Sequence, residues 1–255
     1  MEKKNNGIII MAGGLGKRMK STLPKVLHPL CGIPMLIRII RKAKELKPKK
    51  ILIVVGKYKN IIEETIIKWE NNMNGLEFVI QEPANGTGHA IQCCVNSIKK
   101  NNLTQVLILN GDNPLIKKET MKSMFYNLSG KKCCIMISYF DNPHGCGRII
   151  LDNKKLIKIV EEKDCNNEQK NINLVNCGVY AFKSNILINN IMKLKNNNSQ
   201  NEYYLTDLME IIKDNENCDI NYIIHPKDKQ YELIGVNTKE ALEQLELDTI
   251  YNNWL

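Results

Sequence analysis

The segment formed by residues 7–19 joins an apolar run to a glycine-rich loop and two cations. It reads GIIIMAGGLGKRM, with glycines at 13, 14 and 16 followed by Lys17 and Arg18. Glycines let backbone N–H groups approach phosphate oxygens, and cations neutralise phosphate charge. The spacing is not that of a Walker A loop or of a dinucleotide-binding fingerprint, because Met11 and Met19 stand where those motifs need glycine. The segment therefore indicates either a phosphate loop of another kind or only a tight strand-to-helix turn.

A further cation follows in the segment LPKVLHPL, where Lys25 comes directly after a proline. A single lysine is most often a solvated surface residue. Two cations that flank a glycine loop, however, suit the charge of a triphosphate. The pairing makes Arg18 and Lys25 candidates for stabilising negative charge that develops during phosphoryl chemistry.

Short apolar runs predict the strands that must position these residues. Runs at 8–11, 51–55, 78–81 and 106–109 predict buried parallel strands, and helical patterns that begin near Pro34, Asn60 and Thr87 alternate with them. This rhythm is typical of a doubly wound α/β sheet, in which ligands bind beyond the carboxyl ends of the strands. Three of the ends carry polar or glycine-rich sequence, at 11–14, 81–82 and 110–112.

The pattern changes after about residue 130. Longer apolar stretches at 133–140, 149–151, 156–162 and 175–182 predict an antiparallel β extension that covers the site. Helices are expected at 184–194 and 205–213, a strand at 219–224, and a final helix from about 238 to 251. The whole chain is expected to form a single α/β domain with a Rossmann-like mixed sheet.

Composition narrows the classes of function. The chain has 255 residues and a formal net charge of +9, but its basic residues are scattered in pairs, which favours small anionic ligands over nucleic acid. Nine cysteines without Cys-x-x-Cys spacing are expected to be reduced, and no apolar run reaches the length of a membrane span. A cytoplasmic protein without nucleic-acid or membrane partners is therefore expected.

Eight motifs in order carry a resemblance to a known family. MAGGLGKRM followed by LPKVLH resembles the signature of sugar-1-phosphate nucleotidyltransferases. Seven later motifs resemble the uridyltransferase half of bacterial bifunctional N-acetylglucosamine-1-phosphate uridyltransferases, at matching intervals and over essentially the whole chain. They are QEPANGTGHA (81–90), LNGD (109–112), GCGRII (145–150), IVEEKD (159–164), NCGVYAF (176–182), NNNSQNEYYLTD (196–207) and GVN (235–237).

The resemblance implies a nucleotide-diphospho-sugar transferase fold, similar to glycosyltransferase A, and assigns roles by position. It implies a nucleotide-binding part at about 1–130, a sugar-binding part at about 131–237 and a C-terminal helix at 238–255. The implied nucleotide-binding residues are Met11, Ala12, Gly13, Gly14, Gln81, Gly86, Thr87, Asn110, Gly111 and Asp112. The implied sugar-binding residues are Gly147, Glu161, Asn176, Tyr204 and Thr206.

The implied reaction joins UTP to N-acetylglucosamine 1-phosphate, giving UDP-N-acetylglucosamine and pyrophosphate. Mg²⁺ is the implied cofactor, held by Asp112 and Asn237, and oxygen ligands suit this hard cation. Arg18 and Lys25 are implied to be catalytic through their charge. The attacking phosphate is already an anion at neutral pH, so the reaction needs no general base.

Three departures from the family pattern leave alternatives open. Cys146 stands where the family usually has tyrosine, Lys17 where it has threonine, and Asn113 where an apolar residue is more usual. The same chemistry on another pair, such as glucose 1-phosphate with UTP or dTTP, stays open, as does a non-catalytic sugar-nucleotide-binding subunit. The β-helix acetyltransferase half of the bifunctional relatives is not expected in this chain, which leaves the oligomeric state open between a monomer and a small homo-oligomer.

Overall fold

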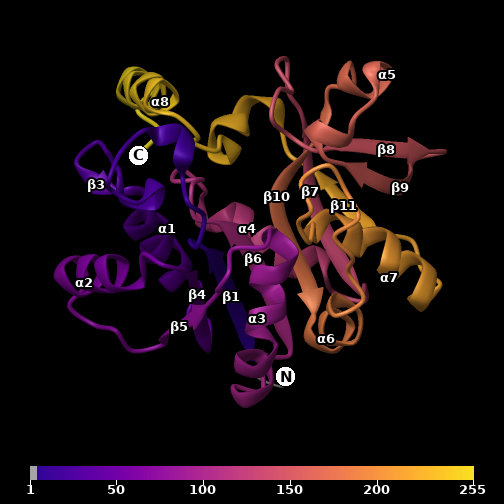
Figure 1. The fold of residues 1–255 in the computed structure, drawn as a ribbon, viewed down its shortest axis with the longest axis horizontal. Coiled ribbons are helices and arrows are strands. Elements are labelled where there is room, and N and C mark those ends of the chain that lie inside the picture. The colour runs from indigo at the N-terminus through magenta and orange to yellow at the C-terminus, as the bar shows by residue number, and fades with distance from the viewer. Residues whose placement is uncertain (1–4) are drawn as a thin grey trace.

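The computed structural model describes residues 5–255, apart from the side chain of Lys17. Its centre is a sheet in which strand β1 lies between two parallel neighbours, β6 and β4, with β5 beyond β4 (Figure 1). All four strands were expected from their apolar runs. Their bounds are Asn6–Met11 for β1, Lys50–Val55 for β4, Leu76–Ile80 for β5 and Gln105–Asn110 for β6. Strands β1, β4 and β6 extend one or two residues beyond their runs, whereas β5 begins two residues before its run and ends one residue before the end of it. The expectation that β5 is buried is wrong, because it is the edge strand of the sheet and is only partly covered.

The later strands extend this sheet at its other edge, in the order β11-β7-β10-β6. Strand β10 (Leu174–Lys183) runs antiparallel to β6 and to β7 (Cys133–Tyr139), whereas β11 (Asn221–Ile224) joins β7 in parallel. Only β8 (Arg148–Asp152) and β9 (Lys155–Val160) project from the sheet, as an antiparallel pair at the right of Figure 1. Much of the expected extension is therefore a continuation of the central sheet.

Helices cover both faces of the sheet because alternate strand residues point to opposite sides. Ile8 and Ile10 pack with α1 (Met35–Lys44), α2 (Lys59–Trp69) and α4 (Lys118–Asn127). Ile9 packs on the other face, in the cluster that includes α3 (Thr87–Lys100), α6 (Ser184–Ile191) and α7 (Leu208–Glu216). Two clusters of buried side chains thus hold the strand ends, where the polar motifs lie, in fixed positions.

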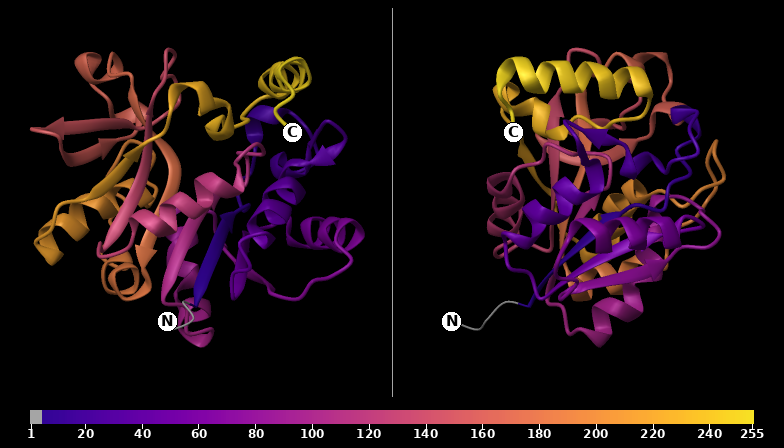
Figure 2. Two further views of the ribbon diagram at one scale, coloured as in Figure 1. Left: turned by 180° about the vertical axis from the view of Figure 1, so that it is seen from behind. Right: turned by 90° about the vertical axis from the view of Figure 1, so that its left-hand side faces the viewer.

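A third, smaller cluster holds the loops above the strand ends. Helix α8 (Lys239–Asn252), yellow in Figure 2, places Leu242 and Leu245 against Met19 and Val236. The short elements β2 (Pro29–Leu30) and β3 (Ile33–Pro34) and the 3₁₀ turns Lys17–Met19, Lys25–Leu27 and Lys227–Leu233 lie near this cluster. The other short elements, α5 (Asn167–Lys170) and the 3₁₀ turns Glu162–Asp164 and Leu205–Asp207, belong to the opposite half of the molecule (Figure 1). The final helix therefore buttresses the glycine-rich loop.

All nine cysteines are unpaired. Within residues 5–255, no helix is both long enough and apolar enough to cross a lipid bilayer.

Candidate active site

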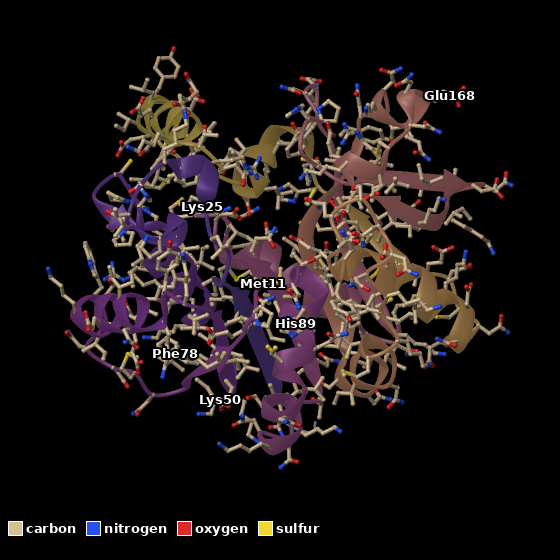
Figure 3. The ribbon with its side chains drawn as sticks, in the orientation of Figure 1. Met11, Lys25, Lys50, Phe78, His89 and Glu168 are labelled. Atoms are coloured by element: carbon tan, nitrogen blue, oxygen red, sulfur yellow. The ribbon has the colours of Figure 1, made fainter. Side chains whose placement is uncertain are left out.

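The carboxyl ends of β1 and β6 bring two predicted motifs side by side. Met11, the last residue of β1, is in register with Asn110, the last residue of β6. The backbone N–H of Gly111 then donates to the carbonyl of Met11 at 2.9 Å, which carries the chain directly into Asp112. Met11 lies near the centre of the molecule in Figure 3. The parallel sheet thus places the LNGD motif next to the start of the glycine-rich loop.

The glycine-rich loop lies against Lys25. Gly16 has a φ of +59°, and a Cβ at this position would lie 2.7 Å from the Cβ of Lys25. A residue with a side chain would be strained in this left-handed conformation and would also push Lys25 away. The glycine therefore permits the close approach that brings both predicted cations, Arg18 and Lys25, to one site.

Four predicted residues converge in a network of charged and polar contacts. The Lys25 ammonium forms an ion pair with Oδ2 of Asp112 and donates to Oδ1 of Asn237 at 3.2 Å. The Arg18 guanidinium donates to the same Asn237 oxygen at 2.9 Å. A backbone hydrogen bond of 3.0 Å from Val236 to the carbonyl of Asp112 holds the two segments together. Residues from three distant parts of the sequence thus meet at a single cluster.

One cavity beside this cluster, of about 550 Å³, contains most of the predicted nucleotide-binding residues. Gln81 forms part of its wall, and the side-chain amide of Gln81 donates to the carbonyl of Gly86 at 2.8 Å. That bond fixes the orientation of the amide. The predicted residues that line this cavity are Met11, Gly13, Gly14, Arg18, Lys25, Gln81, Gly86, Thr87, Asn110, Asp112 and Asn237.

Ala12 and Gly111 do not line the cavity, although both were predicted to bind nucleotide. The Ala12 side chain is buried, and its N–H donates to the carbonyl of Val54 at 2.8 Å. A Cβ at Gly111 would lie 2.7 Å from the carbonyl oxygen of Met11. These two residues therefore lie beneath the cavity, and their backbone groups contact neighbouring strands.

A second cavity, of about 320 Å³, adjoins the first and contains three of the predicted sugar-binding residues, Gly147, Glu161 and Asn176. The two cavities share Met11, Thr87, Asn110, Asp112, Gly145 and Asn237. The cluster of Asp112 and Asn237 therefore lies where they meet. Two ligands bound in the two cavities would come together at this cluster.

Glu161 is the principal charged group of the second cavity. Its carboxylate accepts a hydrogen bond of 2.8 Å from the hydroxyl of Thr206. Burial in the protein raises the pKa of Glu161, and the bond from Thr206 acts in the opposite direction. Asn176, also in the wall, donates to the hydroxyl of Tyr180 at 2.6 Å. The polar groups of this cavity are thus held in place by buried neighbours.

Tyr204 and Thr206, which were also predicted to bind the sugar, are not among the residues that line this cavity. The Tyr204 hydroxyl donates to the carboxylate of Asp164 at 3.0 Å and accepts from Gln200 at 2.8 Å. Thr206 is buried, and its hydroxyl is bonded to Glu161, which does line the cavity. Both residues were assigned by motif position, which does not distinguish a side chain that faces the cavity from one that supports its wall.

Sequence reasoning missed several residues that support the site. The φ of Gly178 is +69°, and any side chain there would overlap Asn110. The buried Arg148 forms an ion pair of 2.6 Å with Glu162 and donates to the carbonyl of Cys146, which itself lines the second cavity. Gly178 and Arg148 both belong to motifs that carried the resemblance, NCGVYAF and GCGRII. The motifs therefore indicated that Gly178 and Arg148 matter, but the sequence did not show that they contact Asn110 and Glu162.

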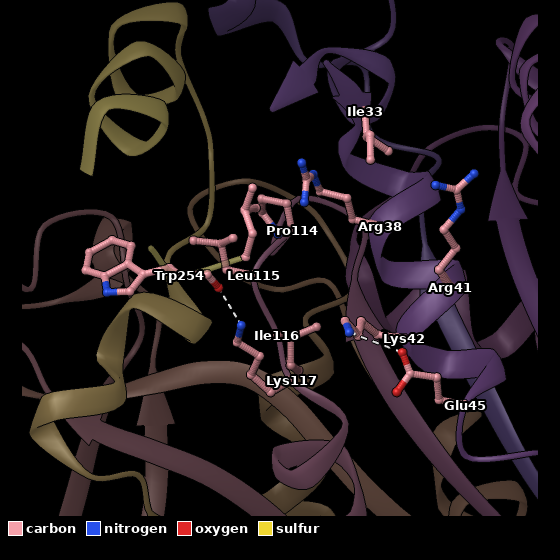
Figure 4. Close-up of a pocket in the computed structure, with 11 residues that line it drawn as sticks. Ile33, Arg38, Arg41, Lys42, Glu45, Pro114, Leu115, Ile116, Lys117 and Trp254 are labelled. Atoms are coloured by element: carbon pink, nitrogen blue, oxygen red, sulfur yellow. Dashed lines mark hydrogen bonds and ion pairs between the residues drawn. The ribbon is translucent and has the colours of Figure 1, made fainter. Parts of the chain in front are cut away.

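A further cavity, of about 230 Å³ and shown in Figure 4, shares no lining residue with the two cavities of this site. The charged groups around it have partners within the chain. Arg38 donates to the carbonyl of Leu30 at 3.0 Å, Lys42 pairs with Glu45 at 3.1 Å, and Lys117 donates to the carbonyl of Trp254. None of the predicted site residues lines this cavity, so it does not compete with the candidate active site.

Among residues 5–255, no group of three or more His, Cys, Asp or Glu side chains is arranged to hold a metal ion. A metal site here would therefore depend on few protein ligands. Asp112 and Asn237 fit such a site, because a carboxylate oxygen and an amide oxygen already converge on one cation, the Lys25 ammonium. Mg²⁺ is commonly bound by one or two carboxylates together with substrate phosphates.

The mixed sheet, the glycine-rich loop and the paired cavities define a nucleotidyltransferase. Residues 8–250 match the model of the MobA-like NTP transferase domain, and the chain belongs to this family. A protein of Acanthamoeba polyphaga mimivirus named probable UDP-N-acetylglucosamine pyrophosphorylase is 46% identical over 94% of each chain. The bifunctional protein GlmU of Prochlorococcus marinus is 40% identical over 94% of this chain and 52% of its own, so this chain spans about half of that relative.

Comparison with solved structures shows which fold this chain shares. The crystal structure of a UDP-glucose pyrophosphorylase complexed with UDP-glucose superposes with a TM-score of 0.74, covering 97% of this chain and 99% of the other. The sequences are 18% identical, so the likeness shows a shared fold. The expectation of a nucleotide-diphospho-sugar transferase fold is confirmed.

Proposed function

We propose that this chain transfers a uridylyl group from UTP to N-acetylglucosamine 1-phosphate. The observation that carries the proposal is the convergence of Arg18, Lys25, Asp112 and Asn237 where two cavities meet. The name of the mimivirus relative supports the choice of substrates. The larger cavity would take UTP and the smaller one the sugar.

In the proposed reaction, a phosphate oxygen of the sugar phosphate attacks the α-phosphorus of UTP in line. A new P–O bond forms, the bond between the α-phosphorus and the bridging oxygen breaks, and pyrophosphate leaves with the electron pair. The nucleophile carries its negative charge at neutral pH, so the protein has only to orient the two phosphates and to neutralise charge. No side chain has to remove a proton.

Lys25 and Arg18 would stabilise the charge that builds up on the departing pyrophosphate. Both now contact the oxygens of Asp112 and Asn237, which are also the proposed ligands of Mg²⁺. A metal ion bound there would compete with Lys25 and Arg18 for these oxygens, and the phosphate oxygens of UTP would offer the two cations other acceptors of the right charge. Bound Mg²⁺ would supply further neutralisation of the phosphates.

Selection of the base and the sugar would depend on side chains fixed by their neighbours. Gln81 is 5% exposed, and its amide orientation is set by the bond to Gly86, so it would present a defined pattern of donors and acceptors to uracil. Glu161 and Asn176 would meet the sugar hydroxyls and the acetamido group. A site built to hydrogen-bond such groups discriminates strongly against ligands that lack them.

The test is to measure pyrophosphate release from a panel of nucleoside triphosphates and sugar 1-phosphates, with and without Mg²⁺. We expect fast release only from UTP with N-acetylglucosamine 1-phosphate and Mg²⁺, and loss of release in Asp112→Ala. Faster release with glucose 1-phosphate would show that the sugar assignment is wrong. Cys146, which stands in the wall of the smaller cavity where the family usually has tyrosine, is the reason to test this sugar. Absence of release from every pair would overturn the proposed reaction.

A further inference from the structure

The proposed metal ligands come from segments that the sheet does not hold together. Asp112 follows β6 in the central sheet, whereas Asn237 lies in the connection between the 3₁₀ turn Lys227–Leu233 and α8. A pair of ligands binds a metal ion well only if their separation is fixed. Some contact must therefore hold residues 233–237 against the end of β6.

Asn113 makes such a contact. It is 4% exposed, and its side-chain amide donates to the carbonyl of Leu233 at 3.0 Å. Its side-chain oxygen faces Gly235, where a Cβ would lie 3.5 Å away, and accepts no hydrogen bond from the part of the chain that the structure describes. Next to it, Val236 donates to the carbonyl of Asp112 at 3.0 Å. The side chain of Asn113 and the backbone of Asp112 thus bind two points of one short segment.

Glu232 anchors the same segment from its other end. The buried Glu232 carboxylate accepts from the hydroxyl of Thr120 and from the backbone of Lys117, the latter at 3.2 Å. This anchor precedes Leu233 and leaves residues 233–237 to be positioned separately. An apolar side chain at 113 could fill the space of the asparagine, but it would leave the Leu233 carbonyl without that donor.

We propose that Asn113 is a positioning residue that fixes residues 233–237, and through them the side-chain oxygen of Asn237, at metal-binding distance from Asp112. The inference rests on the proposed function, since it assumes that Asp112 and Asn237 are the metal ligands. Asn113 belongs to the wall of the smaller cavity, but its side chain is almost fully buried and its amide is bonded to Leu233 rather than to Asp112 or Asn237. Its effect should therefore appear in metal affinity.

The test is to titrate Mn²⁺ alone into the full-length protein and to follow free Mn²⁺ by EPR. Asn113→Val and Asn113→Ala each remove the donor to Leu233 without adding a charge beside Asp112. The dissociation constant for Mn²⁺ is expected to rise about 10-fold to 100-fold, the effect typical of losing a group that orients a metal ligand. The control Asn190→Val removes another buried amide, one in α6 that is bonded to the carbonyl of Ile186 and to Glu216. It is expected to lower the Tm without changing Mn²⁺ affinity.

The outcomes separate this inference from the proposed function. If Asp112→Ala abolishes Mn²⁺ binding while both Asn113 variants bind as tightly as the native protein, the positioning role is wrong and the metal site stands. An equal loss of affinity in Asn190→Val would show that general destabilisation is the cause, and would also overturn it. If the native protein binds no Mn²⁺, or if Asp112→Ala binds it unchanged, the proposed metal site fails and the inference fails with it.

Discussion

The two cavities of the active site are built in different ways. The wall of the larger, nucleotide-side cavity consists mainly of strand ends and a glycine-rich loop, with two cations at its edge. The smaller cavity is lined by Glu161 and Asn176, each of which is hydrogen-bonded to a buried hydroxyl. The first design presents backbone groups and positive charge to a polyanion. The second suits a ligand with uncharged hydroxyls, and it requires the burial of polar side chains.

This difference predicts that substitutions on the two sides will change different kinetic constants. Losing a cation beside the phosphates should lower turnover, because the charge develops in the transition state. Losing a hydrogen-bonding group of the smaller cavity should mainly raise the KM for the sugar phosphate, because the contact is made in the ground state as well. The four predictions below test that division and the buried charge of Glu161 on which it depends, from the largest expected effect on the reaction to the smallest.

Lys25→Met is expected to lower kcat by about 10²–10³-fold, the typical effect of removing one preorganised electrostatic donor. Steady-state kinetics at saturating UTP and sugar phosphate measure it. Lys99→Met, which removes an exposed lysine from the end of α3, controls for the change in net charge. Near-native turnover in Lys25→Met would contradict the catalytic assignment of Lys25.

Glu161→Gln is expected to raise the KM for the sugar phosphate by about 10-fold to 100-fold, because hydrogen bonds to a charged group contribute about 1.5–3 kcal/mol. Glu168→Gln, on the exposed helix α5 at the outer edge of the molecule in Figure 3, is the matched control. A change in kcat without a change in KM would contradict the expectation that the smaller cavity acts mainly on substrate binding.

Glu161→Gln is expected to weaken binding of the sugar phosphate but to stabilise the folded protein at high pH. Because burial raises the pKa of Glu161 above its ordinary value of 4.5, the folded protein is destabilised as this carboxyl ionises. The contribution of Glu161 to stability is greatest below the ordinary pKa and declines as the pH rises through the folded-state pKa. We therefore expect the Tm of Glu161→Gln, relative to the native Tm, to be higher at pH 8 than at pH 4. A constant difference across this range would contradict the raised pKa.

Thr206→Val should have the smallest effect, since Thr206 acts only through Glu161. Loss of one hydrogen bond predicts an increase of about 3-fold to 10-fold in the KM for the sugar phosphate at neutral pH. Since the Thr206 hydroxyl favours the ionised carboxylate, its removal should raise the pKa of Glu161 further. The acid limb of a plot of 1/KM against pH should therefore move to higher pH. Thr65→Val, which removes a threonine hydroxyl bonded to the Ile61 carbonyl of α2, should leave that limb in place.

The sequence alone determined the central strands and the residues at their ends. Apolar runs predicted β1, β4 and β6 because a strand buried on both faces must be continuously apolar. The run at 78–81 also predicted β5, but this strand lies at the edge of the sheet and is only partly buried. The parallel arrangement then placed Met11 beside Asn110, since strands that run the same way end at the same edge of the sheet. The cations Arg18 and Lys25 followed from their spacing around the glycines.

Only the tertiary structure decided which of the predicted residues meet and which face a cavity. Asn237 reaches Asp112 through contacts of Asn113 and Val236, and no local pattern in the chain encodes such a distant pairing. Whether Thr206 lines the smaller cavity or supports Glu161 from behind depends on the packing of a 3₁₀ turn against β9 and α7. Local sequence governs backbone preference and apolar periodicity, whereas the direction of a polar side chain is fixed by partners that the whole fold brings to it.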